Sequence, residues 1–555
     1  MRITYNDKLN KLLNPYLESL LKEKTSLEPE TLTLFDMFME DLDMGGRYGI
    51  FSEILEPRLE EIIREENIES IANLMDGKLH KLFHYMLGDE FAALFRTYLQ
   101  LEARCPHTIG YDRRAQRSTH PSNHLDHARD AWLQFLKLRA TGFSVEAILK
   151  GGNTPEDIEE FSGYMNSSYW LAAQIAQGNE TVIEYLHQVL TSENNANRLQ
   201  RWYLHAIAIS GHRPLLELEG KLLLAAKLQE GVRQAIVETM DEGCPESYLY
   251  LFSIIYHNGL QRFASVKRSI AVCTGIGEQD SSERITNKYV DLIWNFLNHP
   301  EAARNTLQSK DTVELYLALW SIGFYDTDEI RVIVPDIIRK GAKHQIQTLL
   351  YFLRCTQSSQ MNHLISKDAF EVWHDDPKVV AAILPLYMDG LYLSRYSDNK
   401  ETPALSDYFE TPEEAVRQYE YLKQVYQSIS AKETYSPYVF PWDSIILTRS
   451  EVVLKMAYIA WMTNDARLRE ELCEYLPALE SYSRASYIGI VMAHTESKVE
   501  QEYVLQSLGD RSTDIRDEAY KVLSEMSLSP EQYQSIEELL LSLIHISEPT
   551  RLLSI

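Results

Sequence analysis

The sequence predicts an all-α protein in which short helices pair and the pairs stack side by side. Apolar residues recur three and four positions apart over long segments, as in KLLLAAKLQEGVRQAIVETM (221–240), LYLALWSIG (315–323) and EVVLKMAYIAWM (451–462). Alternation of apolar and polar residues, which indicates a strand, is nowhere sustained. Only 23 glycines and 19 prolines occur among 555 residues, and so few breakers favour long helical stretches over a turn-rich sheet protein.

Three segments carry the same signal for the start of a helix. Thr154, Thr411 and Ser529 are each followed by proline, an acidic residue, and then an acid or amide. The hydroxyl accepts a hydrogen bond from an unpaired backbone amide of the first turn. Proline lacks an N–H where none is needed, and a carboxylate favours the positive end of the helix. Helices are therefore predicted to begin directly after these three residues.

Residues 499–526 predict one helical pair in detail. The second half places an apolar face at helical spacing, with members Ile515, Ala519, Val522, Leu523 and Met526. The first half offers a second such face, with members Val499, Tyr503, Val504 and Leu508. Two short amphipathic helices cannot bury both faces alone, so a similar pair is expected on each side. This need for neighbours predicts an elongated body.

The turn within this pair resembles that of the HEAT repeat. Asp510 is followed by Asp514-Ile515-Arg516, an acidic turn and then an apolar residue with arginine. The resemblance implies a HEAT-like α-α superhelix, or solenoid. It also implies that Asp510 and Arg516 belong to a polar ladder between neighbouring repeats.

A second resemblance rests on residues 232–278. Its features are Asp241-Glu242-Gly243, Asn258-Gly259-Leu260 and Arg262-Phe263-Ala264-Ser265-Val266. The segment resembles large uncharacterised bacterial proteins, some described as molybdate-metabolism-regulator-like, with N-terminal helical domains of unknown function. Ala264 and Lys267 depart from that pattern. The resemblance implies a further C-terminal domain and supplies no catalytic residues.

The closing segment SLIHISEPTRLLSI, residues 542–555, differs from the helical pattern before it. It resembles a peptide found at the ends of unrelated metagenome-derived fragments, which arises when a sequencing adapter is translated in frame with a truncated gene. A non-native tail is therefore expected after a helix that ends near Leu541. A native tail with a short strand and a break at Glu548-Pro549 is the alternative. Truncation would expose an apolar end, so self-association through that end is expected.

The sequence predicts six parts of the chain, whose boundaries are not sharply marked. The predicted parts are an N-terminal helical region (1–104), a polar His/Arg loop (105–125), a HEAT-like helical array (126–395), a linker (396–412), C-terminal HEAT-like repeats (413–541) and the tail (542–555).

Charge and cysteine content limit the partners and the compartment. The formal net charge of −27 repels nucleic-acid phosphates and anionic lipid, so neither nucleic acid nor a membrane is expected as a partner. Five cysteines, an odd number without a CxxC pair, argue against a disulfide framework. The N-terminal segment is too polar for a secretory signal. These features predict a cytoplasmic protein.

The polar loop contains a candidate metal site. Cys105, His107, His120, His124 and His127 fall within 23 residues. His124 and His127 are three apart and would share one face of a helix, where they could bind zinc. The spacing matches no known zinc motif, and histidines also cluster by chance in polar loops.

The same region is the one cationic island of the acidic chain. Residues 101–150 contain 8 Lys/Arg against 5 Asp/Glu. Arg113, Arg114 and Arg117 are candidates for binding a phosphate or an acidic partner, because guanidinium groups match oxyanions. Pairing with the protein's own acids is the alternative, and the favoured one.

These observations predict a non-catalytic protein-interaction scaffold. Long concave faces of stacked helices suit partner proteins, whose binding spreads over many contacts. The alternative is a metal-dependent or phosphate-binding enzyme module that uses residues 105–129. No cofactor is predicted, because no phosphate-binding, zinc-protease or nucleophile-elbow motif occurs.

Overall fold

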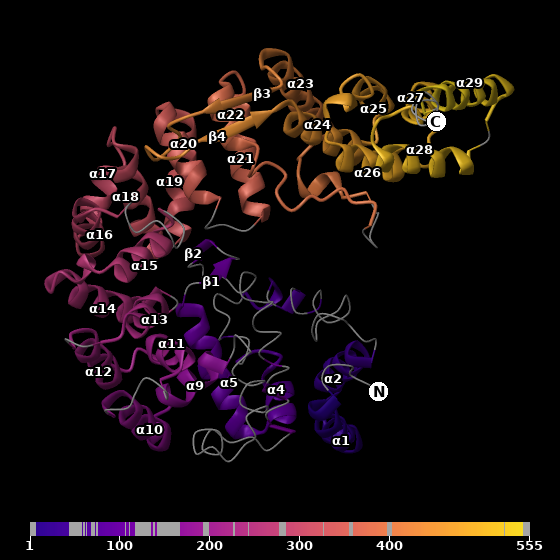
Figure 1. The fold of residues 1–555 in the computed structure, drawn as a ribbon. Helices are drawn as coiled ribbons and strands as arrows, with labels where there is room; N and C mark the ends of the chain where they lie inside the picture. Colours follow the sequence, from indigo (N-terminus) through magenta and orange to yellow (C-terminus); the bar gives the residue numbers. More distant parts are fainter. Residues whose placement is uncertain are drawn as a thin grey trace, which may run out of the picture. The chain divides into compact units, whose positions relative to one another are not determined.

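Helices dominate the computed structural model, which confirms the predicted all-α class (Figure 1). The structure describes residues 7–43, 76–105, 107–109, 112–116, 167–192, 199–225, 228–241, 243–276, 285–325, 327–354, 359–396, 402–526 and 528–547, with isolated positions in 58–73 and 132–140. Within these residues, no helix has both the length and the apolar character that crossing a bilayer demands.

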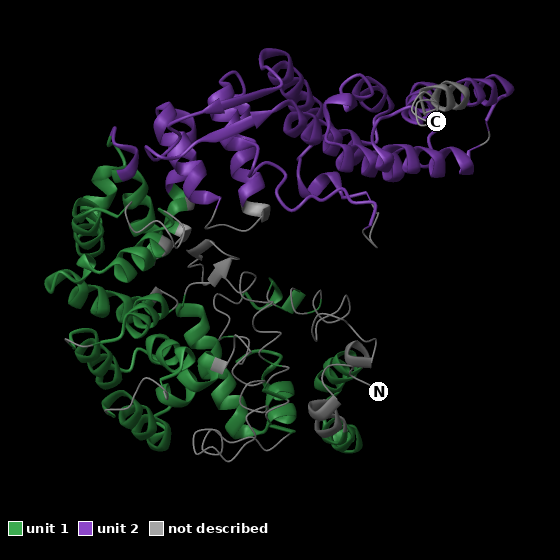
Figure 2. Ribbon diagram, viewed as in Figure 1, with its two compact units in different colours: residues 1–309, 314–332 green, residues 310–313, 333–555 purple. Residues whose placement is uncertain are grey.

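The chain divides into two compact units (Figure 2). Unit 1 comprises residues 1–309 and 314–332, and unit 2 comprises 310–313 and 333–555. The division crosses the helices α18 (Thr312–Tyr325) and α19 (Thr327–Lys340). The predicted linker 396–412 falls inside unit 2. The predicted domain boundaries stay predictions.

The described residues of unit 1 are mostly helical. Its helical elements are α1 (Asp7–Glu23), η1 (Lys24–Ser26), α2 (Pro29–Asp43), α4 (His80–Leu87), α5 (Asp89–Arg104), α9 (Ser167–Ala176), α10 (Glu180–Thr191), α11 (Arg201–Ser210), α12 (Arg213–Leu223), α13 (Glu230–Asp241), α14 (Pro245–His257), η4 (Leu260–Arg262), α15 (Ala264–Thr274), α16 (Asn287–Asn298) and α17 (Pro300–Thr306). Alternate helices contact one another: α5, α9, α11, α13 and α15 in succession, and α10, α12, α14 and α16 likewise. From α9 to α16, helices therefore pack against their next-but-one neighbours along the chain.

Two consecutive helices of unit 1, α11 and α12, differ in how much of their surface is apolar. The helix α11 is apolar on nearly all sides, buries residues from Trp202 to Ile209, and lies between α9 and α13. The helix α12 buries a single stripe that includes Leu215, Leu216 and Leu223. A helix that is hydrophobic all round must be covered on all sides, whereas an amphipathic helix covers a core on one face.

Unit 2 repeats the same order of contacts. Its elements are α20 (Lys343–Leu353), α21 (Ser359–Trp373), α22 (Pro377–Ile383), η6 (Leu405–Asp407), α23 (Pro412–Ser428), α24 (Arg449–Thr463), α25 (Ala466–Leu472), η7 (Leu476–Ala478), α26 (Ser481–Val491), α27 (Lys498–Ser507), α28 (Thr513–Glu525) and α29 (Pro530–Ser547). The helices α24, α26 and α28 contact in succession, as do α25, α27 and α29. The predicted pair 499–526, formed by α27 and α28, therefore contacts the pair α25–α26 on one side and the single helix α29 on the other.

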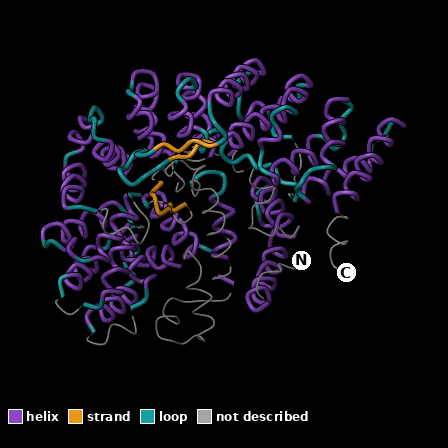
Figure 3. Tube along the Cα trace, turned by 45° about the horizontal axis from the view of Figure 1, so that its top comes forward, coloured by secondary structure: helices purple, strands orange, loops and turns teal. Residues whose placement is uncertain are grey.

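Within the described residues, two short β-hairpins interrupt the helices (Figure 3). In unit 1, β1 (His107–Ile109) pairs antiparallel with β2 (Asp112–Gln116). In unit 2, β3 (Lys432–Tyr435) pairs antiparallel with β4 (Ile445–Thr448), and β4 packs on α22 and α24. The sequence did not predict these strands, because three to five residues are too few to display alternation.

The predicted helix starts are confirmed where they are described. The Thr411 hydroxyl accepts from the Glu414 amide at 3.1 Å. The Ser529 hydroxyl accepts from the Gln532 amide at 3.3 Å, and the Gln532 side chain accepts in return from the Ser529 amide at 2.8 Å. The third start, at Thr154, lies outside the described residues.

Two details of the C-terminal helices differ from the prediction. Val499 is 46% exposed, and Leu505 is buried in its place, because neighbouring helices rather than the period alone decide which face is covered. The helix α29 continues to Ser547, past the predicted end at Leu541. The apolar run before Pro549 contains no helix breaker, so helical geometry persists. The non-native origin of residues 542–555 stays a prediction.

A fully buried histidine ties two segments of unit 2 together. His363 on α21 accepts a hydrogen bond at Nδ1 from the Met388 amide at 2.8 Å, and its Nε2 donates to the Tyr408 carbonyl at 2.8 Å. The bond at Nδ1 needs the neutral imidazole, because a protonated Nδ1 cannot accept a hydrogen bond. Burial lowers the pKa of His363 from 6.5 to about 4, although the bond to Tyr408 opposes that change.

Unit 2 is expected to lose stability as the pH falls from 6.5 to about 4. Because the pKa of His363 is depressed in the folded state, the unfolded chain binds the proton first, and stability present above pH 6.5 is lost on acidification. The loss amounts to about 3 kcal/mol. Urea unfolding at pH 7 and pH 4.5 should show a smaller change in His363→Asn than in the exposed control His187→Asn. An equal change in both variants would contradict this assignment.

Candidate functional site

The residues of the predicted metal site are only partly described. Cys105 is buried directly after α5, and His107 begins β1. His120, His124 and His127 lie outside the described residues. Among the residues that the structure describes, no three metal-ligating side chains gather closely enough to hold an ion. The zinc site stays a prediction.

Two of the three predicted anion-binding arginines belong to the same hairpin. Arg113 and Arg114 belong to β2, which pairs with β1 through Thr108 opposite Ala115. Arg117 lies outside the described residues. Part of the predicted loop 105–125 is therefore a hairpin, and the ligand of these arginines stays untested.

Asp510 and Arg516 make different kinds of contact. The Asp510 carboxylate accepts a hydrogen bond from the Arg484 guanidinium on α26 at 2.7 Å. This contact joins the helical pair α25–α26 to the pair α27–α28. Arg516 instead donates to the carbonyls of Asp510 and Arg511 at 2.8 and 3.0 Å, within its own turn.

The residues that carry the family resemblance have structural contacts in unit 1. The Phe263 ring lies between two guanidinium groups, with Arg233 at 3.8 Å and Arg262 at 4.7 Å from its centroid. Gly259 adopts a φ of 59°, and Arg262 donates to its carbonyl at 3.1 Å. Gly243 lies against the backbone of Ala208. These contacts fix the connections between α13, α14 and α15.

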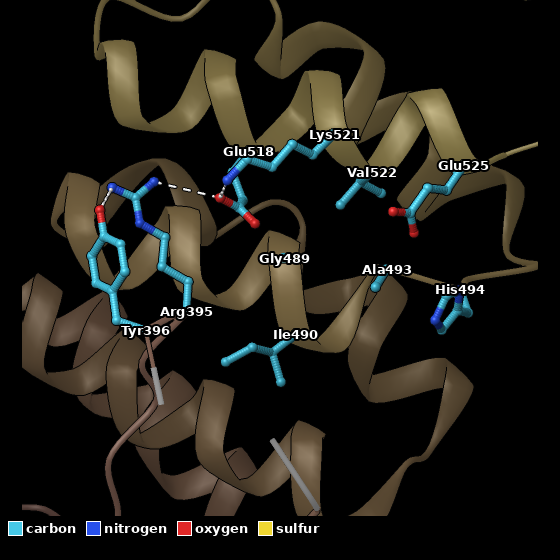
Figure 4. Close-up of a pocket in the computed structure, with 10 residues that line it drawn as sticks. All are labelled: Arg395, Tyr396, Gly489, Ile490, Ala493, His494, Glu518, Lys521, Val522 and Glu525. Carbon is cyan, nitrogen blue, oxygen red and sulfur yellow. Dashed lines mark hydrogen bonds and ion pairs between the residues drawn. The ribbon is translucent and has the colours of Figure 1, made fainter. Parts of the chain in front are cut away.

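A pocket of about 490 Å³ between α26 and α28 is the candidate functional site (Figure 4). It lies wholly within unit 2, and its lining is mostly polar, with a small apolar floor made by Ile490, Ala493 and Val522 between charged and aromatic walls. Its lining residues are Arg395, Tyr396, Gly489, Ile490, Ala493, His494, Glu518, Lys521, Val522 and Glu525. In Figure 4, Arg395 and Tyr396 lie at one end, and His494 and Glu525 lie at the other.

Residues 391–396 form an irregular strap that supplies one wall of the pocket. The backbone amide of Arg395 donates to the Ser486 hydroxyl on α26 at 3.2 Å. Its guanidinium donates to the carboxylate of Asp514 on α28 and, at 3.1 Å, to the Asp514 carbonyl. Arg395 therefore connects the strap to both helices, and its side chain is only 8% exposed.

Two carboxylates keep Arg395 charged at this buried position. Burial disfavours the charge, but the hydrogen bond and negative charge of Asp514 outweigh it and raise the pKa of the guanidinium. Glu518 adds a second carboxylate 3.6 Å away and also pairs with Lys521 at 3.1 Å. This end of the pocket is electrostatically balanced.

Gly489 is required for this arrangement. A Cβ atom at Gly489 would lie 2.3 Å from Oε1 of Glu518. Because Gly489 has no side chain, the buried Glu518 carboxylate can lie against the backbone of α26 and face Arg395.

Tyrosines surround the strap on its exposed side. Tyr392 is 68% exposed and Tyr396 is 72% exposed. The hydroxyl of Tyr482 lies 2.7 Å from that of Ser394 and 3.3 Å from that of Tyr392. Exposed tyrosines beside a pocket are typical of protein interfaces, where aromatic residues are enriched.

This pocket was not predicted from the sequence. The strap lies at the end of the predicted array and the start of the predicted linker, where LYLSRYSD suggests a polar connection. The one available signal was a concentration of tyrosine around a single arginine. Its partner Asp514 lies 119 positions further along the chain.

Comparison with known proteins gives one match. The model of a family of unknown function, DUF5724, matches residues 34–543, which cover most of both units and the whole pocket. No curated protein and no solved structure matches the chain.

Proposed function

The chain belongs to this family of unknown function, and from that premise we propose that it is a non-catalytic scaffold that binds other proteins through stacked helical pairs. The observation that carries the proposal is the packing of alternate helices into two rows within each unit. This order of contacts supports a HEAT-like α-α superhelix. Stacked pairs of this kind present extended surfaces to partner proteins.

The α26–α28 pocket supports the same function. It offers an apolar floor, a rim of fixed charges, and exposed tyrosines on the adjoining strap. Binding energy at protein interfaces concentrates where an anchor side chain fills such a pocket and aromatic residues surround it. We place the protein in the cytoplasm, because the cysteines at 105, 244, 273 and 473 are buried thiols. Its place in a larger bacterial regulatory protein stays a prediction.

Peptide display on the purified full chain tests the scaffold function. A random dodecapeptide library is selected against the immobilised protein and against a blank surface. We expect related sequences to be enriched on the protein and to bind in solution with dissociation constants in the micromolar range, about −8 kcal/mol. Enrichment no greater than on the blank surface would refute the proposed function.

A further inference from the structure

We propose that the α26–α28 pocket binds a short partner segment that carries a large apolar side chain beside a lysine or arginine. The proposal deepens the scaffold function and rests on it. The apolar side chain occupies the floor of the pocket, and the cation lies at the end formed by His494 and Glu525.

The size and lining of the pocket define the apolar position. A volume of about 490 Å³ falls within the usual range of ligand pockets, roughly 300 to 1,000 Å³. Ile490 and Ala493 of α26 and its extension face Val522 of α28 across the floor. Burying a leucine- or phenylalanine-sized side chain there removes apolar surface of both partners from water.

The directions of the two helices define the position of the cation. Residue numbers along α26 and α28 increase toward the same end of the pocket, where Ala493, His494 and Glu525 lie (Figure 4). Both helices end there, at Val491 and Glu525. The unpaired carbonyls of a helix C-terminus carry partial negative charge. Arg469 already donates to the Val491 carbonyl at the end of α26, so the C-terminus of α28 and the Glu525 carboxylate are the groups that favour a positive charge.

The pattern of ion pairs separates the two ends of the pocket. Glu525 is exposed and has no ion-pair partner in the described part of the chain. At the opposite end, Arg395 and Lys521 are already neutralised by Asp514 and Glu518. An acidic partner segment finds no unpaired cation there, whereas a basic segment finds an unpaired carboxylate. The net charge of −27 adds long-range attraction for a basic segment.

The strap tyrosines extend the surface beyond the pocket. Tyr396 lines the pocket and is 72% exposed, and its ring centroid lies 6.3 Å from that of Tyr482. A segment anchored in the pocket would cover these rings. Large aromatic side chains add contact area at a small loss of conformational entropy.

An array of dodecapeptides tests the proposal on the full chain. Two adjacent central positions vary over all residues, and the flanks are glycine and serine. We expect peptides with Leu, Ile, Met or Phe beside Lys or Arg to bind roughly tenfold better than those with Asp or Glu in the basic position. Equal binding of basic and acidic peptides would overturn the charge assignment.

Two substitutions localise the binding. Ala493→Phe fills the pocket and is expected to weaken the basic peptides at least about tenfold. Glu525→Lys should remove the preference for basic over acidic peptides, while the matched charge change Glu474→Lys, at an exposed position outside the lining, should preserve it. Unchanged binding by Ala493→Phe would place the peptides elsewhere and refute the site.

One further variant and its control keep the result interpretable if a pocket variant unfolds. Tyr396→Ala is expected to weaken binding several-fold, whereas Tyr533→Ala removes another exposed tyrosine, 56% exposed and on α29, and should have no effect. Equal effects of the two would count against the strap surface. Failure of all peptides to bind would refute the scaffold function itself, whereas binding without these preferences would refute only the assignment of the partner.

Discussion

Replacing Glu500 by alanine is expected to lower the free energy of unfolding of unit 2 by about 3 to 5 kcal/mol. Glu500 on α27 is only 1% exposed and forms a two-pronged ion pair with Arg469 on α25, at 2.9 and 2.7 Å. Arg469 also donates to the Val491 carbonyl at 3.0 Å. Removing the carboxylate leaves a guanidinium that is only 16% exposed without its counter-charge.

Urea unfolding of the full chain measures this effect, with Asp336→Ala as the matched control. Asp336 pairs with Lys340 at a similar distance, 2.9 Å, but both side chains are about three-quarters exposed. Water screens such a pair, so the control should change stability by less than about 1 kcal/mol. The double variant Glu500→Ala/Arg469→Ala should recover part of the loss, because it leaves no buried charge unpaired. Similar effects of Glu500→Ala and Asp336→Ala would show that burial does not strengthen the Glu500 pair.

Replacing Gly243 by alanine is expected to destabilise unit 1 by about 3 kcal/mol. Gly243 follows α13 and lies against α11, where the Cys244 amide donates to the Ala208 carbonyl at 3.1 Å. An added Cβ would come within 2.7 Å of the carbonyl carbon and oxygen of Ala208. These are backbone atoms, so relief requires the connection between α13 and α14 to move away from α11.

Gly231→Ala is the matched control in the same unit. Gly231 lies within α13, and an added Cβ there meets no atom within 4 Å. Alanine has the higher helix propensity, so this variant should be more stable than the native chain by up to about 1 kcal/mol. Opposite signs for the two variants in urea unfolding would confirm that close packing on α11, not backbone freedom, selects glycine at 243. A neutral Gly243→Ala would contradict the packing.

The start of a helix could be predicted from the sequence because its causes are local. The cap at Thr411 bonds to an amide three residues away, and the cap at Ser529 does the same. The apolar face of α28 was predictable for the same reason: Ile515, Ala519, Val522 and Leu523 are buried together at helical spacing. Such features depend on bonds and periods within one or two turns.

The candidate site could not be predicted, because its contacts join distant parts of the chain. Arg395 lies in a segment without regular pattern, and its charge partners Asp514 and Glu518 belong to a helix more than a hundred residues later. The polar cluster that the sequence favoured, residues 105–129, lies mostly outside the described residues. The prediction of a site at residues 105–129 rested on histidines and arginines that lie close together in the sequence. The pocket, in contrast, is formed by residues that only folding brings together.

Local sequence pattern was enough to predict that this protein is helical, that helices begin after Thr411 and Ser529, and which face of α28 is apolar. Hydrogen bonds within a turn and the 3.6-residue period are properties of short segments, so they can be recognised before the chain folds. The tertiary structure alone decided that alternate helices form rows, that Glu500 meets Arg469, and that the strap closes one wall of a pocket between α26 and α28. These outcomes depend on which apolar faces and charges meet across long stretches of chain, and that choice is made by the packing of the whole unit.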